Sequence, residues 1–376
     1  MKKILAAGLL SVVALFSCQQ AGTKDDGTIT VTNEGLTVCD VSRVKDTLEI
    51  PLSEWVEELK VVHFEDSDTA LFRFQWLSIT DEHILIKPYH RADAALLFDY
   101  QGKFLCDVGS VGEGPGEYTS LSSHAIDEKN GVIYLANFFR SSKILKYDMR
   151  GKFIGEMEAD DTLNKPKIKC NPDGTLSVVH LYFHDSGSKY QAAHIGDEGV
   201  IDSCPPFEHM TIQSKNPQFM GFNHELWCYN NTEELKFMVT VCDTLYRYDV
   251  KKNALKADFA LANLQRDENT WFIINPLPDK YVTMIMGKGT LVSDMKQRKS
   301  YYANLKNDLM GGLPAPFNFT DGYFFAIYEP GRLMTLIEKR LSESGCTEKD
   351  KEVLNKLLAS LDEEGNNVLF VGKLKK

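Results

Sequence analysis

The feature that most constrains the fold of this chain is a strand–turn unit that recurs about every 50 residues. Apolar runs that end in an Asp, with a Gly three residues further on, occupy residues 96–104 and 144–153, and weaker copies occupy residues 193–200 and 245–249. The aspartates are 49, 49 and 52 residues apart. An Asp that opens a turn accepts hydrogen bonds from backbone N–H groups, and Gly readily adopts a positive φ. We therefore interpret these aspartates as turn formers rather than catalytic acids.

The repeat predicts a β-propeller, because each blade of that fold is built from four short strands and repeats after about 40–50 residues. The second unit shows four apolar runs, at residues 123–126, 132–136, 143–147 and 152–157. About 300 residues at about 50 per blade give six blades, which is within the usual range of about 4–8.

The predicted fold class is all-β: a six-bladed propeller over residues 39–376, with an α-helical hairpin inserted before the closing strand. Residues 368–374 form that strand, and residues 47–52 are expected to complete the same blade. The hairpin is expected at about residues 332–362, because apolar residues recur at helical spacing over 353–361. It is expected to pack on the propeller between late strands; the alternative is that it docks a partner.

The N-terminus predicts export and lipid anchoring. Two lysines precede an apolar run over residues 4–16, which is shorter than the roughly 20 residues that span a bilayer and matches a secretory leader. The run ends in Leu-Phe-Ser-Cys, which resembles the lipobox of bacterial lipoproteins. Residues 1–17 are thus the predicted signal peptide, Cys18 the predicted lipidated residue, and residues 18–38 a flexible tether. The expected location is the cell envelope, with a lipid anchor in the outer membrane, facing the periplasm or the outside.

Composition excludes several classes of protein. Hydrophobic residues make up 43% and charged residues 25% of the chain, which is ordinary globular usage rather than that of a disordered, collagen-like or coiled-coil protein. The formal net charge of −11 repels phosphate backbones and argues against nucleic-acid binding. Once Cys18 carries lipid, seven cysteines remain, and no C-x-x-C spacing supports a zinc ribbon or a thioredoxin site. We expect these cysteines to be buried free thiols, with one disulfide bond as the alternative. We also expect the protein to be a monomer.

Four segments resemble a known family. They are residues 52–56 (LSEWV), 109–118 (GSVGEGPGEY), 243–246 (DTLY) and 367–374 (NVLFVGKL). Together with the lipobox, they are similar to the six-bladed β-propeller lipoproteins of Bacteroidota, a family largely of unknown function that is distantly similar to NHL-repeat propellers. The resemblance covers about residues 40–376 and implies no catalytic residues.

Residues 112–118 (GEGPGEY) form the most distinctive candidate site. A phosphate cradle uses glycines that expose backbone N–H groups, but Glu117 stands where a G-x-G-x-x-G motif has its third Gly, and Glu113 adds repulsion. The structural interpretation is a tight crossover between blades, and the functional one is a loop that offers carboxylates and Tyr118 to a cation or a sugar. His124 is expected to line the central channel or to hydrogen-bond to a neighbouring blade. The candidate binding residues are Gly112, Glu113, Gly114, Gly116, Glu117, Tyr118 and His124.

Two histidines form the candidate metal site. If residues 180–185 (HLYFHD) continue a strand, His180 and His184 share one face and Asp185 lies nearby. The two imidazoles would lie roughly 13 Å apart at about 3.3 Å per residue, so one divalent metal needs a bend or a ligand from another blade. The alternative is a half-exposed polar strand face. No other cofactor is implied.

Three functions are compatible with these observations. The first is a non-catalytic binding or scaffolding module that presents a propeller face, with aromatic side chains such as Tyr118, Phe138 and Phe139, to a glycan, a peptide or an envelope protein. The second is a metal-dependent enzyme of the lyase or lactonase type, which requires three or more His, Asp or Glu side chains from different blades to converge on the central channel. The third is a structural assembly role. We favour the first, because the chain shows no established catalytic motif.

Overall fold

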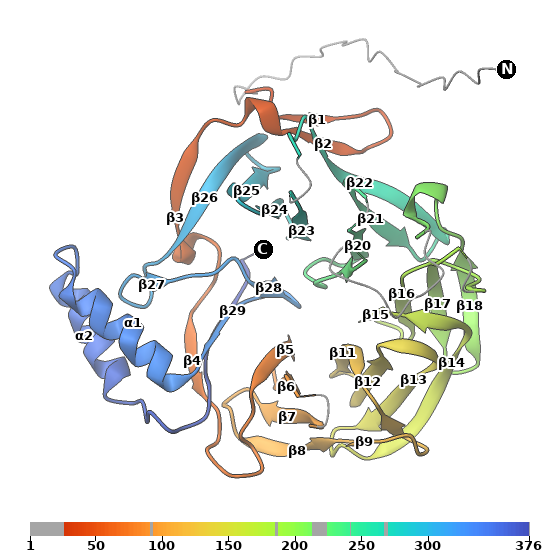
Figure 1. Cartoon of the computed structure of the whole chain (residues 1–376), viewed down its shortest axis with the longest axis horizontal. Coiled ribbons are helices and arrows are strands. Elements are labelled where there is room, and N and C mark those ends of the chain that lie inside the picture. Colours follow the sequence, from red (N-terminus) through yellow and green to blue (C-terminus); the bar gives the residue numbers. More distant parts are fainter. Residues whose placement is uncertain are drawn as a thin grey trace, which may run out of the picture.

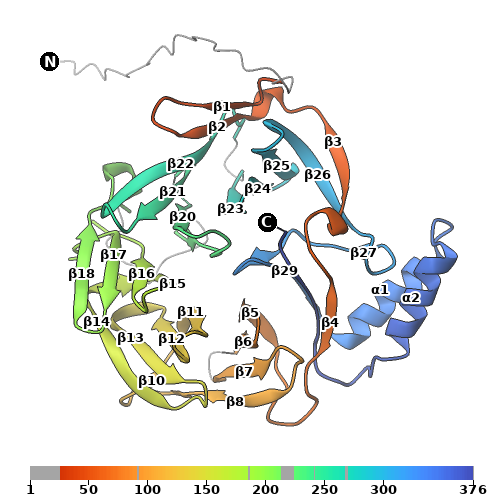
Figure 2. The same cartoon turned by 180° about the vertical axis from the view of Figure 1, so that it is seen from behind.

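The computed structural model describes residues 26–375, apart from 91–92, 185–186, 213–223, 241 and 267–269. Within these residues, six blades are arranged around a central axis (Figures 1 and 2). The first strand of each blade lies nearest the axis and the later strands lie successively nearer the rim. The predicted signal peptide and Cys18 lie outside the described residues. The prediction of an all-β, six-bladed propeller is confirmed.

Blades 1 to 3 each consist of four antiparallel strands from one continuous stretch of chain. Blade 1 contains β5 (Phe74–Ile79), β6 (His83–Pro88), β7 (Ala95–Asp99) and β8 (Phe104–Val108). Blade 2 contains β11 (Leu121–Asp127), β12 (Val132–Asn137), β13 (Phe139–Asp148) and β14 (Phe153–Asn164). Blade 3 contains β15 (Lys167–Cys170), β16 (Leu176–Val179), β17 (Ala192–Gly196) and β18 (Gly199–Cys204). The four strands predicted for blade 2 are confirmed, and all four are longer than expected, the last two by the most.

Blades 4 and 5 carry additional strands from the N-terminal segment at their outer edges. Blade 4 contains β19 (Leu226–Trp227), β20 (Leu235–Val239), β21 (Thr244–Asp249) and β22 (Ala254–Ala262), followed by β2 (Thr37–Asp40) and β1 (Ile29–Val31). Blade 5 contains β23 (Phe272–Pro276), β24 (Lys280–Ile285), β25 (Gly289–Asp294) and β26 (Lys299–Asn307), with β27 (Leu313–Pro314) and β3 (Thr47–Pro51) beside β26. Because β2 and β3 pair in parallel with β22 and β26, they cover two edges that could otherwise pair with another chain.

Blade 6 closes the ring by joining the two ends of the described chain. It contains β28 (Phe319–Thr320), β29 (Tyr323–Tyr328), β30 (Val368–Lys373) and, from the N-terminal part, β4 (Lys60–His63). The prediction that residues 47–52 complete this blade is wrong, because β3 pairs with β26 of blade 5 instead. β3 and β4 are both short outer strands from the N-terminal part of the chain. The sequence pattern does not show which of them pairs with blade 5 and which with blade 6.

The Asp–Gly turns join the third and fourth strands of blades 1 and 2, as predicted. Oδ1 of Asp99 accepts hydrogen bonds from the N–H groups two and four residues further on, each at 2.9 Å, and Asp148 accepts the same pair. Gly151 has a φ of 74°, and a Cβ there would come within 1.9 Å of the Asp107 carbonyl oxygen on β8. The turn of blade 2 therefore packs directly on the outer strand of blade 1, so the repeated motif fixes a contact between blades as well as a hairpin.

The helical hairpin lies where it was predicted, between β29 and β30. It consists of α1 (Pro330–Ser342) and α2 (Glu348–Leu358), and packs on the outside of the propeller (Figure 1). Leu333 of α1 and Leu354 of α2 are buried in one hydrophobic cluster with residues of blades 5 and 6. Thr347 begins α2 with a capping box, which satisfies backbone N–H groups of the first turn. Three short 3-10 turns, η1 (Val41–Arg43), η2 (Leu52–Glu54) and η3 (Glu208–Met210), complete the elements of the described chain.

The cysteines that follow Cys18 are all within the described residues, and all seven are free thiols. Burial raises the pKa of the Cys106 and Cys204 thiols to about 11. A thiol in such surroundings stays protonated and packs as a small hydrophobic group. None of the described helices is long and apolar enough to cross a membrane.

Candidate functional site

A cavity lies between blades 1 and 2, at the end of the propeller that carries the β6–β7 loop and the crossover from β8 to β11. It encloses about 150 Å³. Aromatic rings and hydrogen-bonding groups share its walls, which is the usual composition of a small-molecule pocket. The residues that give the cavity this character are Gln75, Lys87, Tyr89, His90, Asp93, Ser120 and Phe138.

Charged groups support the aromatic wall of this cavity. The Arg73 guanidinium lies 4.9 Å from the centroid of the Tyr89 ring, and His90 packs edge-on against the same ring with centroids 5.6 Å apart. Tyr89 nevertheless remains 55% exposed, so much of its surface is open to a ligand. Lys87 Nζ donates to the carbonyl oxygen of Leu121, which places a positive charge beside the innermost strand of blade 2.

Tyr118, a predicted binding residue, borders the cavity and fastens the crossover to blade 1. The side chain is buried, and its hydroxyl donates to the Val108 carbonyl oxygen at 2.8 Å and accepts from the Ala95 N–H at 2.8 Å. Burial raises the pKa of this hydroxyl to about 12. Tyr147 of blade 2 donates to the Gly116 carbonyl oxygen at 2.9 Å. The crossover is thus held by both blades next to the cavity.

The glycines of the crossover make room for the Glu117 carboxylate. Oε2 of Glu117 accepts from the Gly114 N–H at 2.8 Å, and a Cβ on Gly112 would come within 2.0 Å of the same oxygen. Residues of the loop also pair in parallel, as β9 (Ser110–Val111) and β10 (Glu117–Tyr118). This is the geometry of a tight crossover, in which the Glu113 side chain is exposed. A ligand-binding role for the loop stays a prediction.

His124, the other predicted binding residue, lies in a buried polar chain near the axis. Its Nδ1 is 2.8 Å from Oγ of Ser78 on the neighbouring blade, and the next residue, Ile79, donates its N–H to Oδ2 of Asp321 in blade 6 at 3.2 Å. Burial, reinforced by the charges of Lys87 and Lys167, lowers the pKa of His124 to about 3, so the imidazole is neutral at physiological pH.

The β19–β20 loop of blade 4 contacts other blades near the axis, at the end opposite the cavity. Its Asn231 side chain donates to a carbonyl oxygen of β28 at 3.1 Å, and its Asn230 side chain donates to the Ile168 carbonyl oxygen of blade 3 at 3.0 Å. The Tyr229 ring lies 6.0 Å from the Trp76 ring of blade 1. This loop of blade 4 therefore contacts three other blades, which are blades 1, 3 and 6.

The two predicted metal ligands lie in different surroundings. Residues 180–184 do not continue a strand, because β16 ends at Val179. His180 is fully buried with Nε2 3.4 Å from Oδ2 of Asp161, whereas His184 is exposed. A period-two pattern does not reveal the buried carboxylate that accompanies His180. Asp185 lies outside the described residues, and metal binding by this segment stays a prediction.

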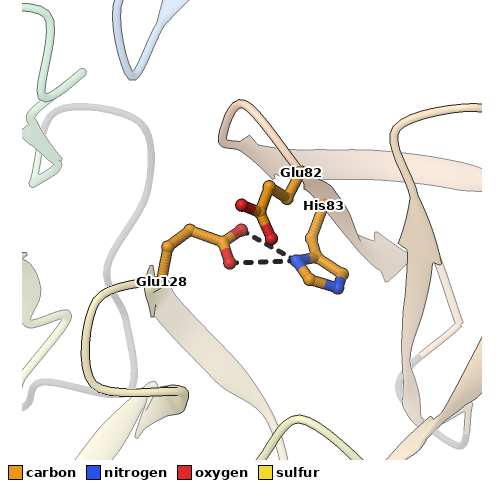
Figure 3. Close-up of side chains that lie close together, drawn as sticks. All are labelled: Glu82, His83 and Glu128. Carbon is orange, nitrogen blue, oxygen red and sulfur yellow. Dashed lines mark hydrogen bonds and ion pairs between the residues drawn. The ribbon is translucent and has the colours of Figure 1, made fainter.

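A second cluster, which the sequence analysis missed, lies between blades 1 and 2 at the end opposite the cavity. Glu82 and His83 lie at the β5–β6 turn, and Glu128 follows β11. Nδ1 of His83 is 2.8 and 3.0 Å from the two carboxylate oxygens of Glu128. One ligand atom from each of the three residues lies within 4.8 Å of the other two. Figure 3 shows both carboxyl groups turned toward the imidazole.

This cluster is the only group of three metal-ligating side chains that converges in the described part of the chain. It joins the turns of two neighbouring blades and does not meet the requirement of the enzyme hypothesis for ligands around the central channel. The sequence contained one signal for this cluster. Glu82 and Glu128 are 46 residues apart, and both lie at the turn between the first and second strands of consecutive repeats.

The fold and the cavity together define the class of protein: a six-bladed propeller with a small polar and aromatic cavity between two blades. The chain belongs to the family described as Domain of unknown function (DUF4934), whose model matches residues 36–373. The resemblance to a propeller family of unknown function is thereby confirmed.

One solved structure supports this fold. A "Putative exported protein" from Bacteroides fragilis superposes with a TM-score of 0.61 at 18% sequence identity, over 89% of this chain and 99% of that one. A protein of unknown function from Bacteroides thetaiotaomicron shows a weaker likeness, with a TM-score of 0.44 and 10% identity over 84% of this chain and 76% of that one. No curated protein matches the sequence.

Proposed function

We propose that the protein is an exported, lipid-anchored propeller that binds a glycan or a peptide of the cell envelope without transforming it. The observation that carries this proposal is the cavity between blades 1 and 2. The Tyr89 and Phe138 rings offer surfaces for stacking, and Gln75, His90 and Asp93 offer hydrogen-bond partners beside them. A volume of about 150 Å³ suits one small unit of a longer ligand.

Export and anchoring are supported by the lipobox-like motif at Cys18 and by the exported description of the Bacteroides fragilis structure. The position of the first strand also supports anchoring through the N-terminal tether. β1 lies at the outer edge of blade 4, at the rim of the propeller (Figure 1). A tether that joins the propeller at its rim leaves both ends of the propeller axis uncovered. The cavity can then face a ligand while the lipid holds the protein at a membrane.

The binding proposal is tested with arrays of envelope polysaccharides and extended peptides. The wild-type protein is expected to retain one class of ligand, and Tyr89→Ala is expected to weaken that binding by about tenfold, the effect of losing about 1.4 kcal/mol of contact energy. Ile201→Ala is the matched control, because Ile201 is 54% exposed on the rim of blade 3. If the wild type, Tyr89→Ala and Ile201→Ala bind equally well, the ligand does not bind in this cavity.

Anchoring is tested by detergent phase partition of the protein made in a bacterium with lipoprotein-processing enzymes. We expect the wild-type protein in the detergent phase, because acyl chains contribute about 0.8 kcal/mol per buried methylene. Cys18→Ser is expected to move it to the aqueous phase. If both proteins partition alike, Cys18 does not carry the anchor.

A further inference from the structure

We propose that Glu82, His83 and Glu128 form a binding site for a divalent transition-metal ion, and that Zn²⁺ is the ion that fits the donors best. This site would be separate from the proposed ligand cavity, since it lies at the other end of the propeller. It would, however, join the same two blades.

The donor set is the first argument. Imidazole nitrogen suits zinc and its neighbours among the transition metals, and carboxylates bind Zn²⁺ at about 2.0–2.2 Å. Three protein ligands with an open fourth position are the usual arrangement of a zinc site that retains a water molecule. The ligand atoms of the cluster, which already lie within 4.8 Å of one another, need only small side-chain rotations to meet around one ion. Glu82 is exposed and free to rotate in this way.

The charge balance of the cluster also favours a cation. Glu82 and Glu128 bring two carboxylates together, and within the described residues Glu82 forms no ion pair. The nearby Asp81 already has a cation, since Lys373 Nζ lies 2.6 and 2.8 Å from its two oxygens. An ion pair between His83 and Glu128 alone would explain their contact, but it leaves the approach of Glu82 without a stabilising partner. A divalent cation would offset both carboxylates.

Neighbouring groups hold the three ligands in position. The Thr80 hydroxyl donates to Oε1 of Glu128 and also accepts from the His83 N–H at 2.9 Å, so one side chain orients the carboxylate and fixes the backbone of the imidazole. Such outer contacts hold ligands in position and raise metal affinity. Because Thr80 and His83 belong to blade 1 and Glu128 to blade 2, a bound ion would tie the two blades together on the side away from the cavity.

The test is a titration of the metal-free purified protein with ZnCl2 by calorimetry, with the thiols kept reduced. We expect one Zn²⁺ per chain and a melting temperature that rises with zinc concentration, because an ion that binds only the folded state stabilises it. Glu82→Gln is expected to weaken binding by about tenfold or more without changing the melting temperature of the metal-free protein. Glu34→Gln is the control, because it removes another exposed carboxylate, in the turn between β1 and β2 at the outer edge of blade 4.

Cobalt distinguishes this site from the seven thiols of the chain. Co²⁺ is expected to give visible d–d bands without the intense near-ultraviolet thiolate band, and His83→Gln is expected to abolish them. Circular dichroism shows whether His83→Gln folds. If it does not fold, the effect of Glu82→Gln on metal binding still tests the proposal. The proposal is overturned by absence of binding, by zinc affinity that neither substitution changes, or by a thiolate band, which would indicate an adventitious ion only.

Discussion

The crossover between blades 1 and 2 and the polar chain at the axis are both rich in hydrogen bonds, but their partners lie at very different separations in the sequence. In the crossover, Glu117 bonds to Gly114, three residues away, and Tyr118 bonds to Val108, ten residues away. At the axis, Ser78 meets His124 across 46 residues, and the Ile79 N–H reaches Asp321 across 242. The two crossover bonds form within one short segment, whereas the bond from Ile79 to Asp321 exists only once the ring has closed.

The largest effect is expected where the repeated turn meets the next blade. Gly151 and Gly287 have φ angles of 74° and 73°, but a Cβ on Gly151 would come within 1.9 Å of a carbonyl oxygen, while Gly287 has no atom within 4 Å. Gly287→Ala is therefore expected to cost only the backbone strain, about 1 kcal/mol. Gly151→Ala should cost about 3 kcal/mol or more, because the two blades must also separate. Urea unfolding measures both, and equal losses would show that the interblade contact contributes nothing.

The axial chain predicts a smaller effect that depends on pH. Burial raises the pKa of Asp321 from 3.8 to about 6, so the folded protein holds a proton that the unfolded chain releases between about pH 4 and 6. Ionisation of Asp321 thus lowers stability as pH rises through this window, by at most about 3 kcal/mol. Since the residue keeps some solvent contact, we expect Asp321→Asn to be about 2 kcal/mol more stable than the wild type at pH 7.5, and equal to it below pH 4.

Guanidinium unfolding at both pH values measures this difference. Asn keeps an acceptor for the Ile79 N–H and tolerates the φ of 53° at this position, so the substitution changes mainly the charge. A variant that is less stable than the wild type at pH 7.5 would mean that the ionised carboxylate is favourable at the axis.

The crossover predicts the smallest of the three effects. Tyr118→Phe removes a hydroxyl that joins the Val108 carbonyl oxygen to the Ala95 N–H and changes little else. We expect a loss of about 1 kcal/mol, the usual value of such hydrogen bonds, with no dependence on pH between 5 and 8 because the hydroxyl pKa is raised to about 12. Thermal unfolding at several pH values is the measurement. Unchanged stability would show that the hydroxyl does not hold the crossover.

The same contrast explains how much could be predicted from sequence. The period of the repeat, the aspartate turns and the amphipathic helices are local patterns, and they predicted the blades, the hairpins and the helical insertion. The edge that β3 covers, the carboxylate beside His180 and the axial loop depend on the closed ring, so local patterns did not reveal them. The cavity was found only in part: Phe138 and Tyr118 were candidates, but Tyr89 and His90 lie in a loop without a motif.

The most direct test of ligand binding between blades 1 and 2 is a crystal structure of the protein with the glycan or peptide that the arrays select. We expect electron density for one unit of that ligand between blades 1 and 2, in contact with Tyr89 and Phe138. Density on the central axis, or at the end that carries Glu82 and Glu128, would contradict it.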